Sequence, residues 1–293
     1  MSTIELSALP APQVLEDLDF EDVYQNDLTA FRSHMGGDWT AQLESDPVTK
    51  LLEVGAYRTL QNRARVNDAA KALMLAYALG SDLDQLAANV SLNRLVVQPE
   101  DLTTSPPTMA VLEEDDALRE RVQLVYEGLT TAGPRNSYIL HARNASGLVA
   151  DATAESPSPA VVTVTVLSLD GTGAASADLL AVVRVKLSDD DVRPVGDRLS
   201  VQSAQVLHYT ISAVVHMASG GPEIEATLAE CRRRLAAWIN PRRRLGIEVS
   251  RSAIDAQLHI AGVSRVELLG WQDISPTKAQ AAWCDDFTVT LGG

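Results

Sequence analysis

Four aspartates and two arginines fall within residues 189–198, in the stretch LSDDDVRPVGDRLSVQSA. Carboxylates at this density could bind a calcium ion or carry acid–base chemistry. A calcium loop of the EF-hand type requires a glycine at its sixth position and a glutamate at its twelfth. Counted from Asp189, those positions hold Pro194 and Ser200, so the spacing excludes this loop. The stretch is instead interpreted as a joint, where a helix ends, the chain turns and a strand begins.

The other charged residues of this kind also have structural explanations. Asp82 and Asp84 lie at the expected start of a helix, where the helix dipole favours carboxylates, so capping accounts for them. In the joint, Arg193 is expected to form an ion pair within the turn, in preference to a bond with a partner chain. Its expected partners are Asp189, Asp190 or Asp197.

The histidines do not form a recognisable catalytic or metal-binding motif. None of the five stands in an HExxH or HxH arrangement. His208 and His216 share one face of an expected strand, but eight residues of strand separate them by roughly 26 Å. The sequence also lacks a GxSxG elbow and a GxxxxGK[ST] loop. Gly171-Thr172-Gly173 precedes a helix but lacks the third glycine of a dinucleotide site. We therefore expect no metal, no cofactor and no catalytic residues.

Composition restricts the possible partners. The chain has 24 basic and 39 acidic residues and a formal charge of −15, which repels phosphate backbones, so nucleic acid is not an expected partner. The N-terminus has no secretory pattern, and no segment approaches the roughly 20 apolar residues that span a bilayer. We expect folding in the cytoplasm and no membrane contact. Cys231 and Cys284 are interpreted as buried packing residues.

Charge is distributed unevenly along the chain. Residues 1–55 hold eleven acidic side chains against Arg32 and Lys50, whereas residues 232–251 hold seven arginines against one glutamate. Two solvated faces would account for this pattern. Opposite patches that meet complementary patches on a neighbour would account for it equally well, and such asymmetry suits an assembly protein.

The N-terminal third has helical periodicity. Apolar residues from Phe20 to Met35 recur at helical spacing, and Ser45-Asp46-Pro47 then starts a long helix over about 47–79. An isolated amphipathic helix is marginal in water, so its apolar stripes need partner helices. The side chains expected at a partner interface are Val48, Leu51, Leu52, Val66, Leu73 and Tyr77.

The rest of the chain mixes helices and strands. The pattern over residues 106–204 has the order α-α-β-β-α-β, which suggests a mixed α/β layer. Residues 206–217 alternate strictly between two faces and predict a strand with one buried side. The fold class is therefore α+β and multidomain. We expect an N-terminal long-helix region over 1–105, a central mixed α/β domain over 106–204 and a small C-terminal α/β sandwich over 205–293.

Three motifs in order carry a resemblance to a known family. A G-x-x-L-D-x-L-A turn begins at Gly80, a D-x-x-L-R-x-R helix begins at Asp115, and a V-R-P-x-x-D element begins at Val192. In this order they resemble the baseplate J-like proteins, which are wedge subunits of contractile phage tails and of pyocin-like particles. Many relatives carry a glycine and an arginine after the first turn. Here Asn93 replaces the glycine and Arg94 is kept, so the local path of the linker is expected to differ.

The resemblance implies a structural role without catalysis. It implies a triplex in which two copies of the chain join one smaller I-like wedge protein. Six such units would ring the central spike or hub, beside a lysozyme-like wedge or sheath-initiator protein. The implied location is the tail baseplate, assembled in the bacterial cytoplasm, where the ring would help transmit the trigger for sheath contraction.

A small-molecule-binding or hydrolytic enzyme is the alternative. Catalytic groups are recognised by geometry rather than by sequence order, so folding could bring histidine and aspartate together. A deep pocket in which His141 or His259 touches a carboxylate and a hydroxyl would support this alternative.

Overall fold

The computed structural model describes residues 6–10, 12–36, 43–129, 134–218, 220–221 and 223–292, except for the side chains of Ser7, Glu127, Leu129 and Arg242. The chain divides into two compact units, a helical unit that ends at Asn93 and a mixed unit that begins at Arg94. Helices and small sheets together confirm the α+β, multidomain class. The expected three-part division at residues 105 and 204 stays a prediction.

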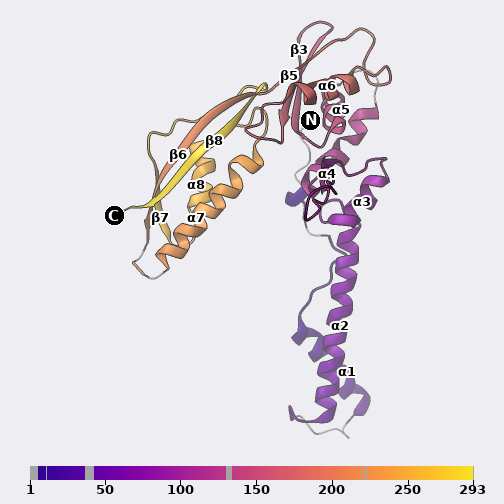
Figure 1. Ribbon diagram of the computed structural model, residues 1–293. Helices are drawn as coiled ribbons and strands as arrows, with labels where there is room; N and C mark the ends of the chain where they lie inside the picture. Colours follow the sequence, from indigo (N-terminus) through magenta and orange to yellow (C-terminus); the bar gives the residue numbers. More distant parts are fainter. Residues whose placement is uncertain are drawn as a thin grey trace. The chain divides into compact units, whose positions relative to one another are not determined.

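The helical unit is built on two helices that lie side by side, α1 (Phe20–Met35) and α2 (Pro47–Ala72) (Figure 1). Each begins at an aspartate whose carboxylate accepts a backbone N–H of the first turn, Asp19 from Asp22 and Asp46 from Val48. Buried Val23 and Leu28 of α1 and Ala56 of α2 belong to its interior. A 3₁₀ turn, Leu6–Ala8, precedes these helices and α3 (Gly80–Ala88) follows them.

The long helix is shorter than expected, because α2 ends at Ala72 and not near residue 79. The Leu73 N–H bonds the carbonyls of Ala70 and Lys71, and a second turn then closes from Ala78 to Met74. These bonds tighten the chain into turns and bury Ala78 completely. Of this short segment Ala78 alone is buried, whereas Leu73 and Tyr77 are exposed. No proline or glycine between Ala72 and Ala78 signals the end.

The central layer is a three-stranded sheet in the order β3–β4–β5. β3 (Val149–Ser158) and β4 (Val161–Ser168) are antiparallel, and α6 (Ala177–Leu187) crosses over to the parallel strand β5 (Arg198–Ser203). The helices α5 (Arg135–Ala145) and α6 pack into one apolar core with the sheet. Before them come a short hairpin of β1 (Val96–Gln98) and β2 (Val111–Leu112), the helix α4 (Asp115–Leu124) and a 3₁₀ turn (Val125–Leu129).

The C-terminal layer places β6 (Gln205–Met217) between β7 (Val263–Leu268) and β8 (Gln280–Leu291). The helices α7 (Ile224–Trp238) and α8 (Arg251–Leu258) cover one face of this sheet (Figure 1). The expected alternation is confirmed, because Ile211, Ala213 and Val215 are buried against them. Cys231 and Cys284 are both buried, as expected. A 3₁₀ turn, Asn240–Arg242, follows α7.

A single residue separates the two sheets along the chain. β5 ends at Ser203 and β6 begins at Gln205, with Ala204 between them. The N–H of Ala204 donates to the carbonyl of Val166 in β4, and the N–H of Gln205 donates to that of Ala279. The chain therefore passes from the central layer to the C-terminal layer without a loop.

The interpretation of residues 187–204 as a joint is confirmed. α6 ends at Leu187, the chain turns, and β5 begins at Arg198. The expected ion pair of Arg193 was wrong, since none of the described ion pairs joins it to an aspartate and its buried Nε has no hydrogen-bond partner there. Instead, Asp197 accepts a hydrogen bond from the hydroxyl of Tyr138. The partner of Asp197 is therefore a tyrosine hydroxyl 59 residues away in sequence, and not the nearby Arg193.

Candidate functional site

The exposed apolar side chains of α2 are the first candidate surface. Leu51 is 70% exposed and Val66 is 50% exposed, and Leu73, just past the helix, is 77% exposed. Tyr77 is exposed to a smaller extent, whereas Val48 and Leu52 are half-buried. Sequence reasoning missed Val54 and Tyr57, which are also exposed and follow Leu51 at successive spacings of three. That spacing was the available signal, because residues three apart are neighbours on a helix.

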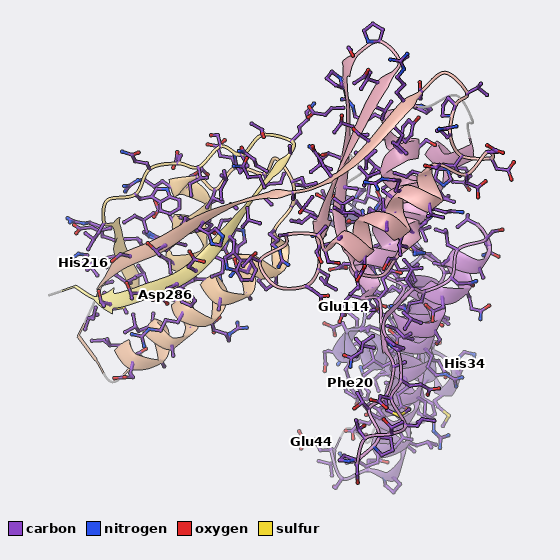
Figure 2. The ribbon with its side chains drawn as sticks, turned by 45° about the horizontal axis from the view of Figure 1, so that its top comes forward. Phe20, His34, Glu44, Glu114, His216 and Asp286 are labelled. Atoms are coloured by element: carbon purple, nitrogen blue, oxygen red, sulfur yellow. The ribbon has the colours of Figure 1, made fainter. Side chains whose placement is uncertain are left out.

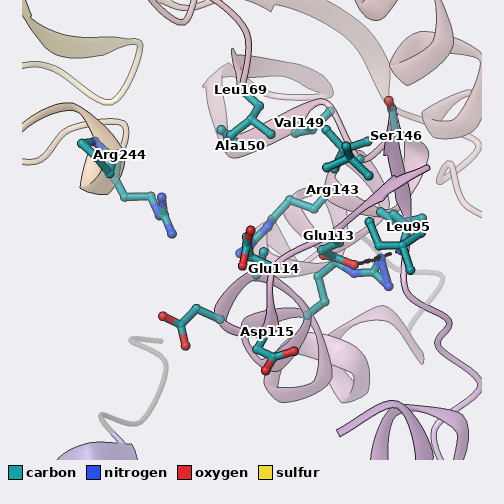
Figure 3. A pocket seen from close by; sticks show the side chains of 18 residues that line it. Leu95, Glu113, Glu114, Asp115, Arg143, Ser146, Val149, Ala150, Leu169 and Arg244 are labelled. Atoms are coloured by element: carbon teal, nitrogen blue, oxygen red, sulfur yellow. Dashed lines mark hydrogen bonds and ion pairs between the residues drawn. The ribbon is translucent and has the colours of Figure 1, made fainter. Parts of the chain in front are cut away.

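The second candidate is a cavity of about 620 Å³ in the mixed unit (Figure 3). Apolar side chains, among them Leu95 and Val149, form part of its wall. Charged side chains form the rest, with Arg143 and Arg244 reaching toward it from different segments. The charged lining consists of Glu113, Glu114, Asp115, Asp116, Arg121, Arg143 and Arg244. A cavity with this many charges could bind a ligand or could be held open by its own ion pairs.

A buried ion pair accounts for one side of the cavity. Nη1 of Arg121 lies 3.3 Å from the carboxylate of Glu113, and the two side chains are 2% and 6% exposed. Glu113 also accepts the backbone N–H of Leu95 at 3.1 Å. Desolvation lowers the pKa of Arg121, and the adjacent carboxylate opposes that shift. The pair holds the hairpin side of the cavity against α4.

Arg94 ties the start of the mixed unit to the same helix. Its guanidinium donates to the Asp115 carboxylate at 2.7 Å and to the backbone carbonyl of Glu113. Gly147 packs against the neighbouring backbone, where a Cβ would lie 2.7 Å from the Val96 carbonyl oxygen. The hairpin of β1 and β2 is therefore held by the polar contacts of Arg94 and by close packing of Val96 on Gly147.

Glu120 of α4 is shared by two arginines. Nη2 of Arg143 lies 2.8 Å from one carboxylate oxygen, and Nη2 of Arg244 lies 3.2 Å from the other. Burial raises the pKa of Glu120, but the two guanidiniums outweigh burial and hold the pKa below its usual value. This carboxylate is therefore ionised at neutral pH and acts as a bridge. The charges around the cavity are largely engaged in such pairs.

The motifs that carry the family resemblance contribute mainly to the interior. Leu83 and Ala87 of the first motif and Leu118 of the second are fully buried. Arg121 of the second motif forms the ion pair with Glu113, and Asp197 of the third accepts from Tyr138. Packing and polar contacts thus account for these motif residues, whereas the buried Nε of Arg193 in the third motif has no hydrogen-bond partner among the described residues.

The contacts of His141 and His259 bear on the enzyme alternative. Among the hydrogen bonds of the described residues, none joins the ring of His141 or His259 to a carboxylate or a hydroxyl. His208 lies 2.8 Å from Asp285 on the exposed surface, and His216 lies on β6 (Figure 2). Within the ranges described, no three histidine, cysteine, aspartate or glutamate side chains gather closely enough to hold a metal ion. The same ranges contain no helix that is long and apolar enough to cross a membrane.

Comparisons with known proteins identify the family. Residues 44–101 match the profile of the baseplate J-like N-terminal domain, and residues 130–203 match that of the baseplate J-like central domain. Baseplate protein J of Escherichia phage P2 is 46% identical over 300 residues, which cover 100% of this chain and 99% of that protein.

A solved chain from the cryo-EM structure of the anti-feeding prophage baseplate is 12% identical, with a TM-score of 0.34. The match covers 94% of this chain and 56% of that chain, so this chain spans little more than half of its length. A TM-score of this size does not establish a shared fold, and the assignment depends on the sequence matches. From these matches, the chain belongs to the baseplate J-like family.

Proposed function

We propose that this chain is a structural wedge protein of a contractile-tail baseplate. The supporting observation is the 46% identity with phage P2 baseplate protein J over the full length of both proteins. In this role the chain forms a triplex, in which two copies join one smaller I-like wedge protein. Six triplexes ring the central spike or hub, beside a lysozyme-like wedge or sheath-initiator protein. The ring is assembled in the bacterial cytoplasm and helps transmit the trigger for sheath contraction.

The exposed apolar face of α2 is proposed as the contact with the neighbouring subunits. Its residues are Val48, Leu51, Leu52 and Val66 of α2 together with Leu73 and Tyr77 of the following turns. Leu51 and Val66 on α2 and Leu73 just past it are exposed, and their apolar surface is removed from water only when a partner covers it. An antiparallel or parallel partner helix would bury the same stripe that α1 leaves uncovered.

The experiment is co-expression of the chain with the smaller I-like partner, followed by size-exclusion chromatography with light scattering. The wild-type chain should elute as a complex with two copies of the chain for each partner. Leu51→Asp and Leu73→Asp should abolish the complex, because each places a charge on the interface. Val195→Asp is the matched control, since Val195 is a fully exposed apolar residue in the joint before β5. A monomeric wild-type chain with no affinity for the partner would count against the proposal.

The enzyme alternative required a pocket in which a histidine meets a carboxylate and a hydroxyl. The described residues place neither His141 nor His259 in such a contact. The cavity that does exist is lined by arginines and carboxylates that pair with one another. The proposal of an assembly protein is therefore the one that these contacts favour.

A further inference from the structure

The segment from Asn240 to Gly246, which connects α7 to α8 and is called the strap below, bonds to the C-terminal sheet at both of its ends. The side-chain amide of Asn240 donates to the carbonyl of Cys284 and accepts the N–H of Cys284, each at 2.9 Å. The N–H of Gly246 donates to the carbonyl of Gln280, also at 2.9 Å. Both partners lie on β8, so the strap is fastened along that strand.

The middle of the strap bonds to the central layer. Arg243 donates to the carbonyl of Leu169, just past β4, at 2.8 Å. Arg244 reaches Glu120 of α4 at 3.2 Å. The backbone N–H of Leu245 donates to the carboxylate of Asp151 on β3 at 2.9 Å. Three consecutive residues of one segment thus bond to three different elements of the other layer.

Apolar packing between the two layers is small. The buried cluster at the junction consists of Leu167, Ala204, Leu245 and Ala281. Among the described residues, the core of the C-terminal layer has 14 buried members and that of the central layer has 11. Small and largely polar interfaces within a chain allow relative motion of the parts that they join. The apolar contact by itself is therefore too small to fix how the two layers sit.

We propose that the strap is a clamp that fixes the C-terminal sheet to the central layer, with Ala204 as the pivot between them. Ala204 supplies the covalent connection from β5 to β6, and the strap supplies a second connection from β8 to α4, β3 and β4. Together with the hydroxyl of Thr153 on β3, which donates to the carbonyl of Lys278 at 2.7 Å, these connections resist the rotation that a single pivot allows. Release of Arg243 and Arg244 leaves the sheets intact and keeps the bond from Leu245 to Asp151, so the angle between the sheets varies over a wider range.

The purified full-length chain tests this clamp. Glu155 on β3 and Glu225 on α7 are exposed, so cysteines placed there can carry spin labels, while the two native cysteines are buried. Distances between the labels are measured by double electron–electron resonance. The double variant Arg243→Ala with Arg244→Ala should widen the distance distribution relative to wild type. Arg233→Ala is the matched control, because Arg233 pairs with Glu230 on its own helix.

A second set of variants protects the test against misfolding. Arg244→Ala and Glu120→Gln remove the same ion pair from opposite sides, so both should widen the distribution in the same direction. Hydrogen exchange of amides in β4 and β6 should stay slow in each variant, which shows that the sheets are intact. An unchanged width in folded variants would overturn the clamp. The inference does not depend on the proposed function, because the free chain reports it without any partner.

Discussion

The hydroxyl of Tyr138 on α5 donates a 2.6 Å hydrogen bond to the carboxylate of Asp197, the residue before β5. This bond ties the helix that covers the central sheet to the turn from which the last strand of that sheet begins. It also accounts for the aspartate of the V-R-P-x-x-D motif, which sequence order would pair with the adjacent arginine. A side chain of α5 therefore stabilises the turn that precedes β5.

Tyr138→Phe should lower the free energy of unfolding by about 1–2 kcal/mol at neutral pH, because it removes a hydrogen bond to a charged acceptor. Desolvation and the Asp197 carboxylate raise the pKa of Tyr138 above its usual value. The folded state therefore favours the protonated hydroxyl, and this stabilisation is lost as the pH rises above about 10. The difference between wild type and Tyr138→Phe, measured by urea unfolding, should shrink in that range. A difference that is constant from neutral to strongly alkaline pH would contradict the bond.

Arg121→Ala should destabilise the chain by about 3–5 kcal/mol, because it leaves the buried carboxylate of Glu113 without its guanidinium. Arg121→Met combined with Glu113→Leu should cost much less than the sum of the single changes, since it removes both charges together. Urea unfolding followed by circular dichroism measures these differences. Arg233→Ala, which breaks an exposed pair, should stay within about 1 kcal/mol of wild type. Additive costs in the double variant would show that the two charges do not interact.

Glu120→Gln should have an effect that depends on pH. The pKa of Glu120 is lowered in the folded chain, because its two arginines outweigh burial. Its ionised form therefore stabilises the fold above the unfolded pKa, and that contribution is lost as the pH falls through the folded pKa. Thermal unfolding of wild type and variant should differ most at neutral pH and converge in acid. If the difference in unfolding temperature between wild type and Glu120→Gln instead increased in acid, the ionised Glu120 would not be stabilising the fold through its two arginines.

Gly147→Ala should destabilise the chain by about 1–3 kcal/mol, because the new Cβ would meet the Val96 carbonyl oxygen at 2.7 Å. The contact is with backbone, so it cannot be relieved by a side-chain rotation. Gly196→Ala is the matched control, since a Cβ there meets nothing within 4 Å. Its stability should stay within about 1 kcal/mol of wild type. Equal stabilities of the two variants, measured by urea unfolding, would show that the hairpin does not pack on Gly147.

Local patterns predicted the elements that carry their own signals. The helix Phe20–Met35 and the alternating strand around Ile211 were predictable, because capping residues and periodicity are properties of residues that are close in sequence. The early end of α2 was not predictable, because backbone turn bonds close the chain after Ala72 and neither a glycine nor a proline marks that position.

The charged cavity was also beyond sequence reasoning. Glu113 and Arg121 are close in sequence, but nothing in their spacing indicates that both become buried. Glu120 and Arg244 are 124 residues apart, and only the fold brings them together. The exposure of Leu51 and Val66 on α2 follows from helical periodicity, whereas their role in an interface stays a prediction. Contacts between segments that are distant in sequence could not be predicted, since they depend on tertiary packing.

The passage through Ala204 limits how the length of this chain can vary. Val201 in β5 and Ile211 in β6 point into the cores of their own sheets, and the two positions are ten residues apart in sequence, an even offset. One inserted or deleted residue at Ala204 would turn the apolar side of β6 toward water, because side chains alternate along a strand. Surface loops absorb such changes easily. Homologous chains should therefore differ in length at their turns and keep this crossing at a constant number of residues.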